Sequence, residues 1–402
     1  MTVTKGGSLR TLRRTNQETL LTLLLHHGPT HRAALARLAG VSRTTVSTIV
    51  GELVDAGLLL EAAPESDRQV DGRARELLHV NPVAGVAAGL DFTLTEVSGR
   101  LTDLSGRPLG TAATTVAPDA NRDERLDAGL ALLDGLLGTA DVPRDRLMGL
   151  GVGVPGQVIR GTGRVGPSLP GQPWAGVDVT AEVRRRLDVP LFVENNTRLE
   201  GVAEAMYGAG RGARHLFYFG LSSGIGSGIF LDGALYRGAV GGAGELGHFS
   251  VDPDGPACPC GNRGCLVQQA SVPAVLEALR PALGPAVTIE EVLAAAAAGD
   301  RACVGVLGDV GHVVGRLLAN VCNLLNPDRI VVGGELAQAG EVLLHPMRSA
   351  LRRYAMPLTR EVELRAAELD LGARAGSAGA AALVLREIPD IAGSLLNTLP
   401  AG

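Results

Sequence analysis

Apolar residues recur at helical spacing in three stretches within the first sixty residues. Four leucines lie on one face of residues 16–26, and shorter stretches follow at residues 32–39 and 43–56. Glycine stands shortly after each stretch, where helices commonly end. The pattern predicts three helices, with Thr30 and Ser42 as N-caps of the second and the third.

The second and third predicted helices are joined by a short turn that begins at Gly40. Small and apolar residues stand where two crossing helices would touch, which is typical of a helix-turn-helix. The third helix directs one apolar set inward, namely Val46, Ile49, Val50 and Leu53. Its opposite face is polar and can reach base edges and phosphates in a DNA major groove, through Ser42, Arg43, Thr44, Thr45, Ser47 and Thr48.

Two predicted strands, residues 58–60 and 76–80, follow the helices and are joined by a polar loop. Arg68, Arg73 and Arg75 in this loop can lie along phosphates or in a minor groove. A structural helix bundle and a solvated loop are the plainer interpretations of the two parts. Their order favours a winged helix-turn-helix DNA-binding domain over residues 1–81.

The remainder alternates apolar strands, many of which end in glycine, with helical stretches. This alternation predicts an α/β body with mainly parallel strand pairing. The expected strands are residues 86–91, 96–103, 149–156, 191–196, 217–228 and 329–334. Small residues at 376–381 permit close helix packing that closes the first lobe, whereas residues 1–15 and 390–402 are expected to be loosely ordered.

Composition supports this division of the chain. With 402 residues, 46% apolar and 3% aromatic, the chain can form two or three domains with cores of alanine, valine and leucine. Residues 1–80 carry a formal charge of +2 and the remainder −7, which fits nucleic acid at one end only. The basic, polar N-terminus does not resemble a signal peptide, and we expect a soluble cytoplasmic protein without membrane insertion.

One imidazole and three thiols are closely spaced in the second half of the chain. His248, Cys258, Cys260 and Cys265 are separated by proline and glycine, which favour a tight loop and suit a structural, tetrahedral Zn²⁺ site. Disulfides are the alternative, but the total of five cysteines is odd and Cys258 and Cys260 are one residue apart. The other two cysteines, Cys303 and Cys322, stand in apolar helical surroundings and are expected to be core thiols.

Around this cluster the chain resembles the ROK family, which groups bacterial sugar kinases with sugar-responsive repressors. The most specific matches are Gly242-Ala243-Gly244-Glu245-Leu246-Gly247-His248 and Gly264-Cys265-Leu266. The family's xylose and N-acetylglucosamine repressors carry an N-terminal DNA-binding unit, whereas its kinases lack one. The resemblance implies a two-lobed actin/hexokinase-like body over residues 82–390, a cleft near residues 195–248, and a dimer or tetramer.

The resemblance also implies a set of sugar contacts. Asn195, Asn196, Glu245 and His248 would lie beside the sugar, and residues 169–171 would form part of the cleft wall. A carboxylate and an amide can make several directed hydrogen bonds to hydroxyls, and a metal would stiffen the loop that aims Glu245. A solvated surface charge is the plainer interpretation of Glu245.

The chain departs from the family's kinases at three positions. Asn196 stands where they have a catalytic aspartate, and an amide cannot accept the proton of an attacking hydroxyl. Thr93, in Asp91-Phe92-Thr93-Leu94-Thr95, replaces a glycine of the first phosphate loop, and Val267 replaces a sugar-binding glutamate. A second glycine-rich segment, residues 224–228, is retained and leaves nucleotide contact open. We expect no enzymatic activity.

The pattern thus favours a transcriptional regulator, most simply a repressor, that binds an inverted-repeat operator in double-stranded DNA and responds to a sugar. A sugar kinase with an accessory DNA-binding unit is the alternative. A regulator controlled by a protein partner at the junction of the two parts is a third possibility.

Overall fold

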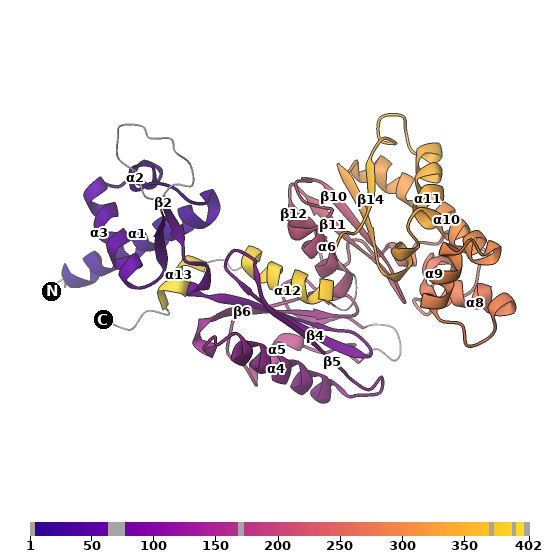
Figure 1. Ribbon diagram of the computed structural model, residues 1–402, viewed down its shortest axis with the longest axis horizontal. Coiled ribbons are helices and arrows are strands. Elements are labelled where there is room, and N and C mark those ends of the chain that lie inside the picture. The colour runs from indigo at the N-terminus through magenta and orange to yellow at the C-terminus, as the bar shows by residue number, and fades with distance from the viewer. Residues whose placement is uncertain (1–4, 63–76, 168–172, 370–373, 388–390, 398–402) are drawn as a thin grey trace.

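The computed structural model describes residues 5–62, 77–167, 173–369, 374–387 and 391–397. The chain forms a small N-terminal unit, here called the head, followed by two α/β lobes (Figure 1). The first lobe is built mainly from residues 82–195 and the second mainly from residues 216–366. The C-terminal helices return to the first lobe and to the head (Figure 1).

The head contains the three expected helices and a two-stranded antiparallel sheet. The third helix buries Val46, Ile49, Val50 and Leu53, as its spacing predicted. The first helix begins at Lys5, so the expectation of loose order before residue 16 was wrong for this stretch. The elements are α1 (Lys5–His27), α2 (Arg32–Ala39), α3 (Arg43–Asp55), β1 (Leu59–Ala62) and β2 (Leu77–Val80).

The two predicted helix caps in the head had different outcomes. Ser42 caps α3, because its side chain accepts a hydrogen bond from the Thr45 backbone N–H. Thr30 does not cap α2, which is preceded by His31 instead. The backbone of Thr30 exchanges two hydrogen bonds with Leu78 of β2, of 3.0 and 2.8 Å, and so extends the small sheet.

The first lobe is a five-stranded sheet in the order β5-β4-β3-β6-β9. Helix α4 packs on one face of this sheet and α12 on the other (Figure 1). The strands are β3 (Val86–Phe92), β4 (Glu96–Asp103), β5 (Pro108–Thr115), β6 (Leu147–Val154) and β9 (Leu191–Asn195), with a small hairpin of β7 (Val158–Ile159) and β8 (Arg164–Val165). The helical elements are η1 (Pro82–Ala84), α4 (Arg122–Thr139), η2 (Arg144–Arg146), α5 (Val179–Arg184) and α12 (Arg374–Glu387).

The second lobe repeats this topology, with the strand order β12-β11-β10-β13-β14. Its strands are β10 (Leu216–Leu221), β11 (Ile225–Leu231), β12 (Ala234–Leu235), β13 (Arg329–Gly333) and β14 (Glu363–Ala366). Its helical elements are η3 (Leu246–His248), α7 (Val267–Ala270), α8 (Val272–Leu283), α9 (Ile289–Ala297), α10 (Arg301–Leu325), η4 (Glu335–Ala339) and α11 (Glu341–Tyr354). Helix α6 (Asn196–Tyr207) packs against β10 and β11 and against α12, and so joins the lobes.

The expectation of mainly parallel pairing was wrong. In each sheet the first three strands pair antiparallel, and only the last two pairings are parallel. Short turns such as residues 222–224 cause this, because a connection of a few residues can join only antiparallel neighbours.

Small residues allow α12 to lie directly on the first sheet, as the sequence predicted. A Cβ at Gly89 would overlap the Ser377 carbonyl oxygen, and one at Gly151 would overlap that of Ala380. On the other side of α12, Gly379 lies against the backbone of Leu199 on α6. The first lobe is therefore closed by backbone-to-backbone contact.

A final helix, α13 (Ile391–Asn397), connects the body with the head. Leu395 and Leu396 are buried in a core that contains Leu20 and Leu21 of α1 and also Met148 of β6. The expectation of loose order beyond residue 390 was therefore wrong for this helix. Its apolar face was too short to distinguish from a disordered tail.

Within the described part of the chain, α10 is the one helix that is long and apolar enough to cross a membrane. Half of the relevant window is buried, however, and the helix packs along α11 in the core of the second lobe. Its apolar composition is accounted for by this packing.

Candidate functional site

The four predicted metal ligands lie together. His248 ends η3, and its ligand atoms and those of Cys258, Cys260 and Cys265 all lie within 4.8 Å of one another. The Cys258 Sγ is 3.7 Å from His248 Nδ1, and the sulfur atoms of Cys260 and Cys265 are 3.6 Å apart. Zinc–sulfur bonds of about 2.3 Å in a tetrahedron give edges of about 3.7 Å. This group could hold a metal ion.

Tight turns in the cysteine loop produce this arrangement. The Cys258 N–H donates to the Asn262 carbonyl at 2.8 Å, and the Gly261 N–H donates back to Cys258 at 2.9 Å. Gly264 has a φ of +59°, and a Cβ there would overlap the Asp252 carbonyl oxygen. Only glycine fits that position, which explains its place directly before Cys265.

The thiols of the cluster differ in acidity. Burial acts to raise the pKa of Cys258, but hydrogen bonds from the Cys260 backbone and from His248 outweigh it and lower that pKa to about 7. Burial and the neighbouring sulfur atoms raise the pKa of Cys265 to about 12. A thiol with a near-neutral pKa readily becomes the thiolate that binds metal.

None of the five cysteines is disulfide-bonded. Cys303 and Cys322 are buried in α10 at a distance from the cluster along the chain, and burial raises the pKa of Cys322 to about 11. Their prediction as core thiols is confirmed.

Glu245 lies directly before η3, three residues from the His248 ligand. Its side chain is 31% exposed, and its Oε1 lies 3.6 Å from Nη2 of Arg198. The segment is held against β11, because the Ser227 hydroxyl donates to the Gly244 carbonyl at 2.7 Å. On the far side of η3, the Cys265 thiol donates to the His248 carbonyl at 3.4 Å. The cysteine loop and Glu245 thus belong to one bonded unit.

The prediction of one strand over residues 217–228 that ends in the glycine-rich segment 224–228 was wrong, because β10 ends at Leu221 and a second strand begins at Ile225. Residues from Ile225 onward form β11, so only the turn at 222–224 is free of sheet pairing. A Cβ at Gly226 would lie 2.8 Å from Oγ1 of Thr197, and one at Gly228 would meet Phe230. Gly226 therefore serves close packing against α6, and Gly228 leaves room for the Phe230 ring.

The side-chain amides of the adjacent residues Asn195 and Asn196 make most of their hydrogen bonds within the protein. Asn195 caps α6 by accepting from the Arg198 N–H, and its Nδ2 donates to the Gly156 carbonyl at 3.0 Å. Asn196 donates from Nδ2 to Asp91 Oδ1 at 2.6 Å and to the Phe92 carbonyl at 3.1 Å. The buried Oδ1 of Asn196 has no hydrogen-bond partner within the described residues.

Burial, with the charge of Glu200 adding to it, raises the pKa of Asp91 to about 8, against the opposing hydrogen bond from Asn196. Glu200, on α6, is half-buried, and desolvation raises its pKa to about 7 although Tyr218 donates a hydrogen bond to it. Desolvation thus shifts both carboxyl groups toward the protonated form.

Thr93, at the predicted glycine position, closes the turn between β3 and β4. Its hydroxyl donates to the Glu96 carbonyl at 3.0 Å and accepts from the Glu96 N–H at 3.1 Å. The buried guanidinium of Arg125 donates to the Thr93 carbonyl and to three carbonyls of residues 117–120. This turn is thus fixed by internal bonds.

The polar face of α3 is accessible. Ser42, Arg43, Thr44, Ser47 and Thr48 are exposed and Thr45 is half-buried. Arg68, Arg73 and Arg75, and the cleft-wall residues 169–171, lie outside the described residues.

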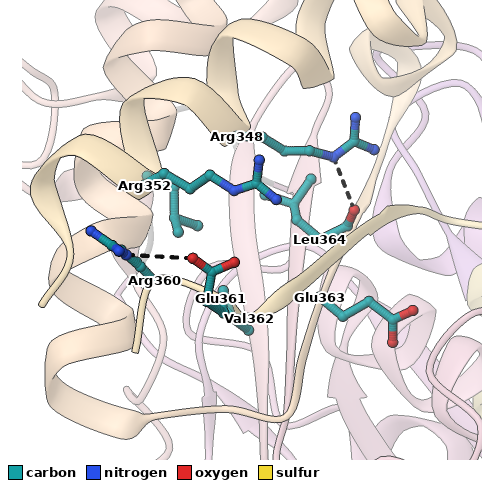
Figure 2. A pocket seen from close by; sticks show the side chains of 8 residues that line it. Arg348, Arg352, Arg360, Glu361, Val362, Glu363 and Leu364 are labelled. Carbon is teal, nitrogen blue, oxygen red and sulfur yellow. Dashed lines mark hydrogen bonds and ion pairs between the residues drawn. The ribbon is translucent and has the colours of Figure 1, made fainter. Parts of the chain in front are cut away.

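A cavity of about 300 Å³ lies on the outer edge of the second lobe, between α11 and β14 (Figure 2). Arg348, Arg352 and Arg360 line it, together with Glu361 and Glu363. Arg348 is held by Glu341 and by the Leu364 carbonyl, and Arg360 is paired with Glu361. None of the predicted ligands contributes to this cavity.

Sequence reasoning missed four charged residues that are linked in series to Glu245, namely Arg198, Glu194, Arg237 and Glu387. Arg198 and Glu194 are almost fully buried and form an ion pair at 3.2 Å. Arg237 joins Glu194 to Glu387 through contacts of 2.6 Å each. The one signal in the sequence is that Glu194 and Arg198 are four residues apart, a spacing that also occurs on ordinary surface helices.

Comparison with known proteins identifies a family and relatives that match most of this chain. A family model described as "ROK family" matches residues 88–387. The chain belongs to the ROK family. It is 28% identical to the xylose repressor of Bacillus spizizenii over 384 residues, which are 94% of this chain and 97% of that protein.

Two solved structures extend the comparison within the ROK family. A ROK transcriptional regulator described as a homologue of the Escherichia coli MLC protein superposes with a TM-score of 0.78 at 26% identity, over 96% of this chain and 98% of that one. The ROK glucokinase of Streptomyces griseus, in complex with glucose and AMPPNP, superposes with a TM-score of 0.65 at 28% identity. It covers 74% of this chain and 99% of its own. The two-lobed body is thus that of a ROK protein.

Proposed function

We propose that this protein is a DNA-binding transcriptional repressor of carbohydrate metabolism whose operator affinity is modulated by a sugar. One observation carries the proposal. The xylose repressor matches 94% of the chain, head included. The glucokinase superposes over 99% of its own length but over only 74% of this chain. The head is therefore shared with regulators and is additional to the kinase body.

The head is proposed to be a winged helix-turn-helix over residues 1–81, with α3 in the major groove. Its exposed residues at 42–48 supply hydroxyls and one guanidinium toward bases and phosphates. The loop between β1 and β2 carries Arg68, Arg73 and Arg75 for backbone or minor-groove contact. In a dimer or tetramer, paired heads would bind an inverted repeat with half-sites about 34–36 Å apart.

The effector site is proposed to lie around Glu245, His248, Asn195 and Asn196. Support comes from the partial exposure of Glu245 and from the hydrogen bond that links η3 to the cysteine loop. The cluster of His248, Cys258, Cys260 and Cys265 is proposed to hold one structural Zn²⁺, since its spacing and near-tetrahedral edges suit that ion. The metal would stiffen the loop that presents Glu245.

Kinase activity is not proposed. An amide at position 196 cannot act as the general base, and here it is also hydrogen-bonded to Asp91 and Phe92. The turn at Thr93 is closed by its own hydrogen bonds. A sugar kinase with an accessory head remains the alternative, favoured by the likeness of the body to a glucokinase.

The proposed site of action is the cytoplasm, where the operator and the sugar are both present. The test is selection of genomic DNA fragments by the purified full-length chain, followed by footprinting. We expect protection of two half-sites near genes of sugar metabolism. Recovery of no fragment above background, combined with phosphorylation of a hexose or pentose by the same preparation, would favour the alternative.

A further inference from the structure

Five charged side chains of alternating sign run from the proposed effector site to the end of α12. In order they are Glu245, Arg198, Glu194, Arg237 and Glu387. The successive oxygen–nitrogen distances are 3.6, 3.2, 2.6 and 2.6 Å. These residues come from the turn before η3, from α6, from β9, from the segment after β12 and from α12.

The middle of this chain of charges is sealed from water. Arg198 and Glu194 each expose 2% of their side chains, whereas Glu245 and Glu387 expose 31% and 36%. Ion pairs that are shielded from water are weakly screened by salt. Removal of one partner leaves the other as an uncompensated buried charge, which costs free energy. A change at either exposed end therefore acts on groups that have few alternative partners.

Arg198 also fixes the backbone that carries Glu245. Its Nη2 donates to the carbonyls of Gly241 and Ala243 at 2.6 and 2.8 Å. Both carbonyls precede Glu245 by a few residues, and the Ala243 N–H in turn donates to the Arg237 carbonyl at 3.2 Å. The two arginines hold the loop through its main chain as well as through its carboxylate.

The other end of the chain of charges leads to the head. Glu387 is the last residue of α12, and α13 follows after residues 388–390. Leu395 and Leu396 of α13 are buried in the same core as Leu20 and Leu21 of α1. In Figure 1 the same path is visible as α12 on the first sheet and α13 beside the head.

We propose that Arg198 and Arg237 are positioning residues for Glu245, and that the ionic link to Glu387 couples the effector site to the head. Sugar hydroxyls that engage Glu245 compete with Arg198 for its carboxylate. Arg198 and Arg237 share Glu194, so this competition alters the ion pair between Arg237 and Glu387. The position of α12, and with it that of α13, changes as a result. The inference rests on the proposed function.

The test compares Glu387→Gln with the unaltered chain and with Glu341→Gln. The control removes a carboxylate of the same type from an exposed ion pair with Arg348 on α11, away from the chain of charges. Affinity for a selected operator fragment is measured with and without D-xylose, D-glucose or N-acetyl-D-glucosamine. Affinity for the same sugars is measured without DNA by calorimetry.

We expect Glu387→Gln to change sugar affinity less than threefold but to reduce the effect of sugar on DNA affinity at least fivefold, within the range of allosteric couplings. Glu341→Gln is expected to behave like the unaltered chain. A purely structural loss at Glu387 would instead lower thermal stability and both affinities together.

A second variant, Arg237→Met, tests the positioning role. It is expected to weaken sugar binding and also to abolish coupling, and the double variant Arg237→Met/Glu387→Gln should lose no more coupling than Arg237→Met alone, because both changes break one link. Full coupling in Glu387→Gln overturns the inference while the proposed function stands. If the unaltered chain shows no DNA binding, or no response to any sugar, the proposed function itself fails.

Discussion

Asn196 donates a hydrogen bond of 2.6 Å from its amide to the carboxyl of Asp91. The pair joins the start of α6 to the end of β3. A residue that would have to accept a proton in a kinase is here a donor to a buried acid whose pKa is raised to about 8. The amide at position 196 is thus used for hydrogen bonding within the protein.

The first prediction concerns catalysis. The unaltered chain is expected to hydrolyse or transfer no ATP phosphate with D-glucose, D-xylose or N-acetyl-D-glucosamine, because position 196 offers no base. The measurement is a coupled assay for ADP, with heat-denatured protein as the background. Sugar-dependent ADP release above that background contradicts this reading of Asn196.

The Asp91–Asn196 pair also predicts a pH dependence of stability. An unfolded aspartate titrates near pH 4, whereas burial raises the pKa of Asp91 to about 8 in the folded chain. The contribution of Asp91 to the free energy of unfolding is fully present below pH 4 and is lost as the pH rises through 8. Between these values the folded state retains a proton that the unfolded state has released. Each unit of difference corresponds to about 1.4 kcal/mol.

Asp91→Asn is the variant that isolates this effect. The amide can still accept the hydrogen bond from Asn196 but carries no charge. Denaturant titrations from pH 5 to pH 9 should show a smaller fall in the free energy of unfolding for Asp91→Asn than for the unaltered chain. Parallel curves for the two proteins would show that Asp91 is ionised in the folded state.

The third prediction concerns the metal. Protein purified without exposure to a chelator is expected to contain about one equivalent of zinc per chain. Cys258→Ser should lose the zinc and lower the midpoint of thermal unfolding. Cys303→Ala, which removes a buried thiol far from the cluster in sequence, should retain the metal. Less than half an equivalent in unchelated material, or full zinc in Cys258→Ser, contradicts the site.

The fourth prediction concerns the polar face of α3. Arg43→Ala should weaken operator binding by about tenfold or more, since one guanidinium contact with a base or a phosphate contributes about 1–3 kcal/mol. The control is Arg184→Ala, an exposed arginine of α5 in the first lobe. Fluorescence anisotropy at fixed salt gives both affinities, and equal affinities for the two variants would contradict a DNA contact of Arg43.

Local features of this protein could be read from the sequence. The helices of the head, the cap at Ser42 and the four clustered ligands depend on residues near one another in the chain, where spacing carries the information. The close packing of α12 was also predicted, because a run of small residues permits few other arrangements.

Features that depend on distant partners could not be read in the same way. Thr30 resembled a helix cap, but its backbone is used by β2, a pairing that residue type does not encode. The segment that contains Gly226 resembled a phosphate-binding motif, but the glycine is needed because a Cβ at that position would crowd Thr197 of α6. The link from Glu245 to Glu387 spans five elements, and only the fold brings those charges together.

Reciprocal titration of sugar and operator tests the central claim most directly. The affinity of the full-length chain for its selected DNA fragment is measured against rising sugar, and its affinity for that sugar is measured with and without the fragment. Linkage requires both affinities to change by the same factor, and the account predicts a weakening of at least fivefold for one of the sugars tested. DNA affinity that stays constant at saturating concentrations of every sugar that binds would contradict it.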